Sequence, residues 1–331
     1  MRYERILQAN GIQPVHVNVN DSSFWSTLKS VDYFIFPWSH QNNECQVALS
    51  IIPIIEKHLS VTCYPSLSTC WHYDDKIRQY YLLKLHGFPF IESWIFWNRE
   101  RAQDWLSQAE LPLVFKLTGG AGSENITLLE TRRDAQRMID LMFSSGIVSG
   151  AIPSRFSYRR LTSAQHSLRK QLGKLRLMAS GNWARRFKTA HQGYVLFQRF
   201  LPNNEFDTRV TVIGSRAFAF RRHNRPKDFR ASGSGRIDWD PEPIDLSCVK
   251  LAFEISGKLG FQSMAYDFLF DHDMKPAVAE ISYIYKDVAV YNCPGFWDES
   301  LAWHEGHYWP QYCQLVDLLG RPELSQPDMQ G

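Results

Sequence analysis

A glycine-rich loop between two short apolar segments is the feature that most limits the folds open to this chain. Residues 112–116 have the composition of a buried strand and run directly into Thr118-Gly119-Gly120-Ala121-Gly122-Ser123, and a second strand is predicted at residues 126–129. Glycines let backbone N–H groups approach an anion closely, so the loop is a candidate phosphate cradle. Because Lys116 precedes the glycines and a strand follows them, the pattern is neither a P-loop nor a dinucleotide-binding fingerprint. An ordinary hairpin turn is the alternative interpretation.

Two acidic residues lie on a predicted hairpin over residues 265–281. With a turn centred between Asp273 and Met274, Asp267 faces Glu280 at a Cβ separation of roughly 4.5 to 5.5 Å. Like charges at this distance repel unless a cation joins them, and Mg²⁺ takes one or two carboxylates together with phosphate oxygens. Ser282 lies two residues beyond Glu280 and therefore projects to the same face. The pattern predicts a magnesium site, with a pair of exposed edge-strand acids as the alternative.

A third set of candidate residues, all charged, lies in and around a second predicted hairpin. This hairpin covers residues 208–221, with its turn at Gly214-Ser215. Asp207 and Arg209 stand at its start, and Arg230 follows in a Gly/Ser-rich loop. An arginine in such a loop suits a bidentate phosphate contact. Asp207 and Arg209, taken alone, are most often a surface charge pair.

Basic charge is concentrated in one part of the chain. Residues 141–204 contain no Asp or Glu but 11 Lys plus Arg, and since the whole chain carries only +3, the remainder sums to −8. This stretch is either a solvated, partly helical excursion or a positive wall beside a polyanionic nucleotide or acidic substrate. The small net charge of the whole chain gives no reason to expect a nucleic-acid partner.

Length and composition exclude several classes of protein. A chain of 331 residues with 44% hydrophobic residues predicts two or three packed subdomains. The six cysteines form no C-x-x-C pair, the N-terminus has no secretory pattern, and the longest uncharged apolar run, residues 47–55, is too short for a membrane span. We therefore expect a cytoplasmic protein with reduced thiols and no membrane span.

Strand-like and helix-like segments alternate before the glycine-rich loop, which predicts an α/β arrangement. Strands are expected at residues 15–19, 33–36 and 61–64, with a helix at residues 44–58 between them. Asp74 or Asp75 is predicted to cap the following helix, which Gly87 and Pro89 end.

The order of these motifs resembles the ATP-grasp ligases, and most closely the RimK-like glutamate ligases and the glutathione synthetases. The resemblance covers about residues 74 to 284 and is carried by the ordered set Asp75-Lys76, Leu113-Val114-Phe115-Lys116, Gln198-Arg199-Phe200, Asp207-x-Arg209, Asp228-Phe229-Arg230, Asp267 and Glu280. It implies the ATP-grasp fold, of mixed α/β and α+β class, with an N-terminal α/β domain over residues 1–73, a central lid over 74–198 that includes the basic stretch, and a C-terminal antiparallel sheet domain over 199–331.

The resemblance also implies a role for each matched position. The residues implied to bind ATP are Lys76, Lys116, Gly119, Gly120, Gly122, Ser123, Gln198, Arg199, Phe200, Asp207 and Arg230. Those implied to act in catalysis are Lys116, Arg209 and Arg230, and the implied magnesium ligands are Asp267, Glu280 and Ser282. Ser282 is a departure, since the family usually has Asn at this position, and the second metal site is expected to be weaker for it.

The implied activity is ATP-dependent joining of a small-molecule carboxylate to an amine through an acyl phosphate, with one or two Mg²⁺ ions for which Mn²⁺ can substitute. The tail, with Cys293-Pro294-Gly295-Phe296-Trp297 and Trp303-His304-Glu305-Gly306-His307, suggests a uronic-acid or amino-acid substrate of surface-polysaccharide biosynthesis, or else simply packs on the sheet. The alternatives are a catalytically weak ATP-binding protein of the same fold and a polyanion-binding module. The oligomeric state stays open, with a homodimer among the alternatives.

Overall fold

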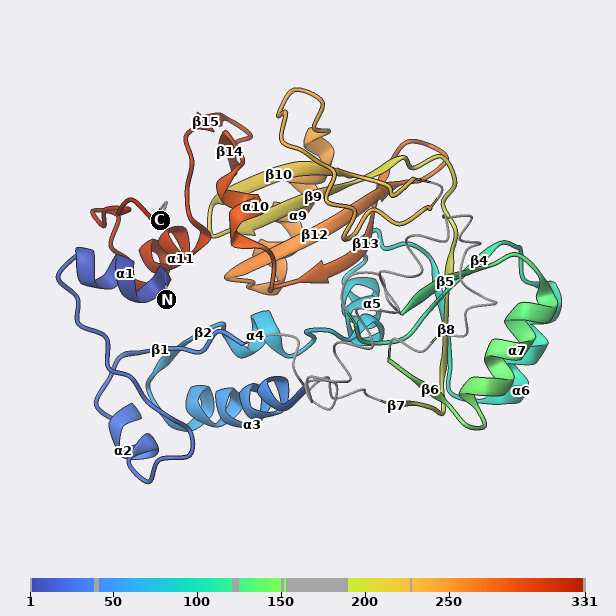
Figure 1. The fold of residues 1–331 in the computed structure, drawn as a ribbon, viewed down its shortest axis with the longest axis horizontal. Coiled ribbons are helices and arrows are strands. Elements are labelled where there is room, and N and C mark those ends of the chain that lie inside the picture. Colours follow the sequence, from blue (N-terminus) through green and yellow to red (C-terminus); the bar gives the residue numbers. More distant parts are fainter. Residues whose placement is uncertain are drawn as a thin grey trace, which may run out of the picture.

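The N-terminal part of the molecule is a small α/β unit built around a short parallel sheet. The structure, a computed structural model, describes residues 2–38, 42–120, 125–149, 152, 190–226 and 228–329. The first elements are α1 (Arg2–Ala9), α2 (Phe24–Leu28), β1 (Tyr33–Ile35), α3 (Asn42–His58), β2 (Thr62–Tyr64) and α4 (Leu67–Cys70). Strands β1 and β2 pair in parallel, and α3 connects them (Figure 1).

The strand predicted at residues 15–19 does not form. Residues 12–18 take no regular structure, although Val17 and Val19 pack against the hydrophobic core while Val15 stays 63% exposed. The alternating valines thus bury one side as a strand would, but no strand among the described residues pairs with their backbone. The alternation of valines predicted a strand, but a strand also needs a neighbouring strand that pairs with its backbone N–H and C=O groups.

The middle of the chain forms a four-stranded antiparallel sheet with two helices packed on it. Its elements are α5 (Lys76–Leu85), β3 (Ser93–Phe96), α6 (Arg99–Gln108), β4 (Leu113–Lys116), β5 (Ile126–Leu129), α7 (Arg132–Met142), β6 (Ile147–Val148), β7 (Ala190–His191) and β8 (Val195–Arg199). The strand order is β3-β8-β4-β5, and Phe115 and Phe197 are buried beneath α6 and α7. Asp75, and not Asp74, caps α5, because its side chain accepts hydrogen bonds from the Ile77 and Arg78 amides.

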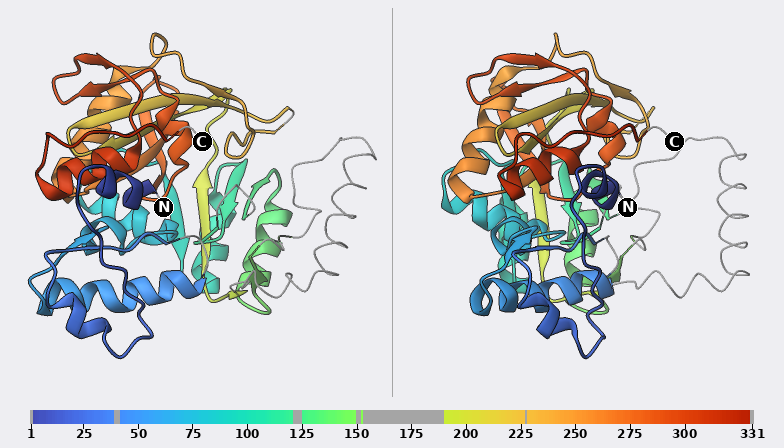
Figure 2. Two further views of the ribbon diagram at one scale, coloured as in Figure 1. Left: turned by 60° about the vertical axis from the view of Figure 1, so that its left-hand side comes forward. Right: turned by 90° about the vertical axis from the view of Figure 1, so that its left-hand side faces the viewer.

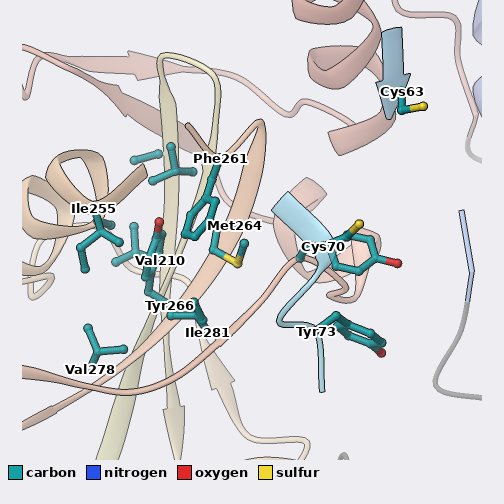
Figure 3. Close-up of a cluster of buried hydrophobic side chains, with 14 of the residues drawn as sticks. Cys63, Cys70, Tyr73, Val210, Ile255, Phe261, Met264, Tyr266, Val278 and Ile281 are labelled. Atoms are coloured by element: carbon teal, nitrogen blue, oxygen red, sulfur yellow. The ribbon is translucent and has the colours of Figure 1, made fainter. Parts of the chain in front are cut away.

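A larger sheet fills the C-terminal part. Its elements are β9 (Phe206–Ile213), β10 (Arg216–His223), β11 (Ile237–Asp238), α9 (Leu246–Leu259), β12 (Ser263–Phe270), β13 (Pro276–Ser282), α10 (Asp287–Tyr291), β14 (Gly295–Asp298), β15 (Trp303–Glu305) and α11 (Pro310–Leu319). The order is β13-β12-β9-β10-β14-β15, and β11 pairs with β10. Helix α9 covers one face, where Val210, Ile255 and Tyr266 are packed together (Figure 3).

The opposite face of the large sheet changes from apolar to charged along its strands. At one end, Ile213, Phe218 and Phe220 pack beneath α10 and α11. Toward the other end, the same face of β9 and β10 carries Arg209 and Asp207 of β9 and Arg222 of β10, because residues two apart on a strand share a face. The helices therefore leave open the part of the sheet that presents charged side chains.

The two ends of the chain lie side by side. Helix α1 packs on α11 (Figures 1 and 2). The Arg2 guanidinium lies 2.6 Å from a carboxylate oxygen of Asp287 and 4.1 Å from the centre of the Trp309 ring. Among the described residues, no helix has the length and apolar character needed to cross a bilayer.

The hairpin of β12 and β13 confirms the predicted pairing of Asp267 with Glu280, but not the predicted turn. Near the turn, Phe270 pairs with Pro276, which centres the turn on Asp273 and in a regular ladder would place Asp267 opposite Ala279. A β-bulge between Asp267 and Phe268 shifts the register by one residue and brings Glu280 opposite Asp267. The facing carboxylates thus depend on the bulge.

His72 is a buried ring without hydrogen-bond partners in the turn before α5. Its side chain is 1% exposed, neither ring nitrogen has a hydrogen-bond partner among the described residues, and the ring lies 5.1 Å from that of Phe261. Burial lowers the pKa of His72 to about 4. The folded protein therefore excludes the imidazolium ion that the unfolded chain readily forms.

The low pKa of His72 predicts how the free energy of unfolding depends on pH. Because the folded-state pKa lies below the unfolded value, the free energy of unfolding is unaffected above about pH 6.5 and falls between pH 6.5 and 4, by about 3 kcal/mol in full. We expect His72→Phe to remove this part of the acid sensitivity in urea unfolding at pH 7.5 and 5.0. His272→Gln, at a side chain that is 84% exposed, serves as the control and should leave the difference unchanged. Equal acid sensitivity in His72→Phe and the parent would contradict the prediction.

Candidate functional site

A cavity of about 200 Å³ lies where the four-stranded sheet meets the charged face of the large sheet. Its walls come from β4, β5 and β8 on one side and from β9, β12 and β13 on the other. The predicted residues that line it are Lys116, Gln198, Arg199, Phe200, Asp207, Arg230, Asp267 and Glu280. A wider depression of about 430 Å³ adjoins it and shares Asn224 and Phe229. Residues that are far apart in the sequence therefore meet in one place.

Apolar side chains line one end of the cavity. Ile91, Val114 and Leu269 line it, and the rings of Phe200 and Phe229 meet edge to face at 5.7 Å. The Gln198 side chain is buried and donates a hydrogen bond to the Ser93 hydroxyl. Such a slot suits a flat heterocyclic ring, which apolar walls sandwich while polar groups at the edge fix its orientation.

The other end of the cavity carries the two facing carboxylates. Asp267 and Glu280 are cross-strand neighbours and both line the cavity. Two carboxylates are the kind of donor that Mg²⁺ takes when phosphate oxygens and water complete its shell. No group of three or more His, Cys, Asp and Glu side chains suited to a metal occurs in the part of the chain that the structure describes. The residues therefore fit a metal held jointly with a phosphate ligand, not a protein-only cage.

Two buried lysines approach this end from the other side. The Lys76 ammonium lies 3.2 Å from a carboxylate oxygen of Glu280 and donates to the Gly120 carbonyl at 3.4 Å. Burial opposes the charge on Lys76, but Glu280 and Asp74 outweigh it and raise its pKa. Burial lowers the pKa of Lys116 to about 8, and the nearby positive charge of Lys76 adds to this effect. Lys116 thus titrates close to neutral pH.

The start of the glycine-rich loop is held against the turn before α5. The Gly120 amide donates to a carboxylate oxygen of Asp74 at 2.8 Å, and Asn125 donates to the Gly119 carbonyl at 2.6 Å. Asp74 has φ +53°, a left-handed conformation that a non-glycine residue adopts only when its surroundings impose it. Gly122 and Ser123 lie outside the described residues.

Three further predicted residues do not face the cavity as free groups. Arg209 binds Asp267 through two hydrogen bonds, of 2.6 and 2.8 Å. Arg230 lines the cavity but is paired with Asp228 at 2.6 Å. The Ser282 hydroxyl donates to the Ile284 carbonyl at 2.7 Å, and Ser282 is not part of the described cavity lining.

Arg222 is the residue that the sequence analysis missed. It is 7% exposed and forms ion pairs with Asp207 at 2.6 Å and with Asp267 at 2.7 Å. Arg222 shares a strand face with the apolar Phe218 and Phe220. An arginine in such a pattern indicates a buried acidic partner, and this signal was present in the sequence. Burial would raise the pKa of Asp267, but Arg209 and Arg222 outweigh it and hold that pKa below its ordinary value.

The aromatic tail packs on the large sheet. Strand β14 pairs with β10, and the Phe296 ring lies 5.7 Å from that of Phe218. His304 lies on a strand and contacts Asp298 at 2.7 Å, and His307 contacts the Tyr291 carbonyl at 2.8 Å. Most of the basic stretch at residues 141–204, namely residues 153–189, lies outside the described residues.

Similarity to known proteins is visible at the level of structure. No protein-family profile matches this sequence, and no curated protein matches it either. The RimK domain protein from Sphaerobacter thermophilus, described as ATP-grasp, is 14% identical with a TM-score of 0.54, over 96% of this chain and 95% of that one. D-cycloserine synthetase DcsG is 14% identical with a TM-score of 0.55, over 96% and 93%.

A third solved structure is the ADP complex of N5-carboxyaminoimidazole ribonucleotide synthetase, 12% identical with a TM-score of 0.52. The match covers 86% of this chain and 62% of that one, so this chain spans less than two thirds of the length of that enzyme. Likeness at these identities establishes architecture and not activity. With helices and antiparallel sheets arranged as in these structures, the chain has the ATP-grasp fold.

Proposed function

We propose that this chain is an ATP-dependent ligase that joins a carboxylate to an amine. The observation that carries the proposal is the cavity itself, which has an apolar slot at one end and the facing carboxylates with Lys116 at the other, where Lys76 pairs with Glu280. This arrangement suits a nucleotide triphosphate that extends from base to phosphates. One solved structure of this fold holds ADP, which supports nucleotide binding at such a site.

In this proposal the base lies in the slot formed by Gln198, Arg199 and Phe200, and the phosphates lie near Lys76 and Lys116. Asp267 and Glu280 would hold Mg²⁺, or Mn²⁺ in its place, which supplies charge neutralisation for the phosphates. Gly119 would bring its backbone N–H group to the phosphates, and Gly120 would do so once its amide leaves the Asp74 carboxylate. Asp207 and Arg230 complete the cavity wall at the nucleotide.

The proposed reaction has two steps. A carboxylate oxygen of the first substrate attacks the terminal phosphorus, and the bond to ADP breaks, which gives an acyl phosphate. The amine nitrogen then attacks the acyl carbon, inorganic phosphate leaves, and the nitrogen loses a proton as the amide forms. Lys116, Arg209 and Arg230 would act by charge and position, since phosphoryl transfer asks the protein mainly for these.

The substrates belong to the same proposal. We keep them as a small-molecule carboxylate and an amine, because the aromatic tail, on which the uronic-acid suggestion depends, packs on the sheet. The test is ADP release over paired carboxylates and amines. We expect release that requires a carboxylate and is completed by an amine, and ADP formation at full rate without any carboxylate would overturn the proposal.

A catalytically weak ATP-binding protein of the same fold is a second candidate. It is favoured by Ser282, whose hydroxyl is engaged with the Ile284 carbonyl and does not line the described cavity. Ser282→Asn compared with the parent decides between the two. A large gain in ADP release would favour the weak protein, and no gain would favour the ligase.

The pKa of Lys116 gives a pH dependence for nucleotide affinity. Lys116 is charged below about pH 8 and neutral above it, so its attraction for phosphates is lost as the pH rises through this value. We expect affinity for a non-hydrolysable ATP analogue, measured by calorimetry at saturating Mg²⁺, to fall about tenfold between pH 7.5 and 9.5. Lys116→Arg keeps its charge and should flatten the profile. Matching profiles in the two proteins would show that Lys116 does not contact the phosphates.

A further inference from the structure

Two arginines and two aspartates form a compact, largely buried group beside the cavity, and the two aspartates, Asp207 and Asp267, line it. Arg222 bridges Asp207 and Asp267, at 2.6 and 2.7 Å, and Arg209 binds Asp267 at 2.6 Å. Arg222, Asp207 and Asp267 are each less than 9% exposed. The four side chains balance in charge, as buried ionic groups must.

Strand register places the group and keeps it together. Asp207 of β9 faces Arg222 of β10, and Arg209 of β9 faces Asp267 of β12. Asp267 in turn faces Glu280 of β13. One face of four adjacent strands therefore carries a continuous row of charges, in which the two neighbouring carboxylates Glu280 and Asp267 lie between Lys76 on one side and the two arginines on the other. A change at Asp267 is felt by both arginines.

Asp267 has little capacity left to bind a metal. An ionised carboxylate offers about four acceptor positions. Arg209 uses one on Oδ1 and one on Oδ2, and the Arg222 Nη2 atom lies 2.7 Å from the same Oδ2. Glu280 likewise has Lys76 as its partner. A divalent cation that approached these carboxylates alone would meet the positive charges of Arg209, Arg222 and Lys76 at close range.

We propose that Arg222 makes metal binding at Asp267 and Glu280 conditional on bound nucleotide. The guanidinium neutralises Asp267 until phosphates bring negative charge that offsets the added cation. Asp207 then keeps Arg222 in place as Asp267 shares its charge with the metal. Arg222 is a positioning residue in this scheme, which rests on the proposed function for the nature of the ligand.

The test measures Mn²⁺ binding through the paramagnetic resonance signal of the free ion, with and without a non-hydrolysable ATP analogue. We expect the parent to bind Mn²⁺ at least tenfold more weakly without nucleotide than with it. Arg222→Gln should bind Mn²⁺ about tenfold more tightly than the parent in the absence of nucleotide, because one nearby positive charge is gone. A matched control is Arg216→Gln on the same strand, whose partner is Asp317, away from the cavity.

A double variant tests the same inference without leaving a buried charge unpaired. Removing Arg222 alone leaves Asp207 buried without its partner, whereas Asp207→Asn with Arg222→Gln removes the pair together and keeps Arg209 on Asp267. The double variant also frees Asp267 from Arg222, and it should show a gain in nucleotide-free Mn²⁺ affinity that is smaller than in Arg222→Gln, because the negative charge of Asp207 is removed as well.

Unchanged nucleotide-free affinity in both variants would overturn the inference, as would a parent that binds Mn²⁺ equally well with and without nucleotide. Failure of the proposed function is read separately, as absence of ADP release with every carboxylate and amine pair.

Discussion

Glu280→Gln is expected to reduce ADP release by at least about a hundredfold, because one of the two carboxylates proposed to hold the metal loses its charge where the transferring phosphoryl group needs neutralisation. Glutamine keeps the shape of the side chain, so the change isolates the charge. The same substitution removes the partner of Lys76, which is 4% exposed and lies 3.2 Å from Glu280. We therefore expect a lower melting temperature as well, since a buried ammonium loses its counter-charge.

The effects of Glu280→Gln on ADP release and on the melting temperature can be measured separately. ADP release is measured at a temperature well below the melting temperature of the variant, and Mn²⁺ affinity in the presence of nucleotide is measured on the same sample. Asp273→Asn, at the exposed turn of the same hairpin, is the matched control and should leave both quantities unchanged. Normal turnover in Glu280→Gln would show that this carboxylate holds no catalytic metal.

Gly120→Ala is expected to weaken nucleotide binding by about tenfold to a hundredfold. Gly120 has φ +115°, and a Cβ atom there would lie 2.0 Å from the Asn125 side-chain nitrogen. Asn125 is 2% exposed and donates to the Gly119 carbonyl, so it cannot withdraw without losing that bond. The loop must therefore move away from Asp74 and Lys76, which displaces its backbone N–H groups from the position proposed for the phosphates.

Calorimetric titration with the non-hydrolysable analogue checks the prediction for Gly120. Gly193→Ala is the matched control: it has φ +79° and an ideal Cβ would meet no atom within 4 Å. It imposes backbone strain without a collision and lies outside the loop, so it should lower stability but leave nucleotide affinity in place. An affinity in Gly120→Ala equal to that in the parent would mean that the start of the loop does not contact the nucleotide.

Local patterns predicted much of the architecture. The cap at Asp75, the turn at Gly214-Ser215 and the pairing of Asp267 with Glu280 are all present. Each depends on residues close in sequence, whose preferences survive in the folded chain. The hairpin is instructive, because the predicted turn was displaced and a bulge after Asp267 restored the pairing.

Other features could not be predicted from residues close together in the sequence. The valines at residues 15–19 alternate as in a strand, yet no neighbouring strand pairs with them. Arg222 interrupts an apolar strand face and so indicates a buried partner, but no residue near it in the sequence identifies two aspartates on two different strands. Ser282 has the spacing of a ligand, but its hydroxyl is used by the Ile284 carbonyl.

The amino-acid sequence by itself determined the types of element, the glycine-rich loop and the acidic pair, because periodicity, capping and turn chemistry act over a few residues. Only the tertiary structure decided that β13, β12, β9 and β10 lie side by side and that α10 and α11 leave the charged end of that sheet open. Lateral strand order arises from contacts between residues far apart in the chain, where many arrangements satisfy the same local pattern. The row from Lys76 to Arg222 exists only because of that order.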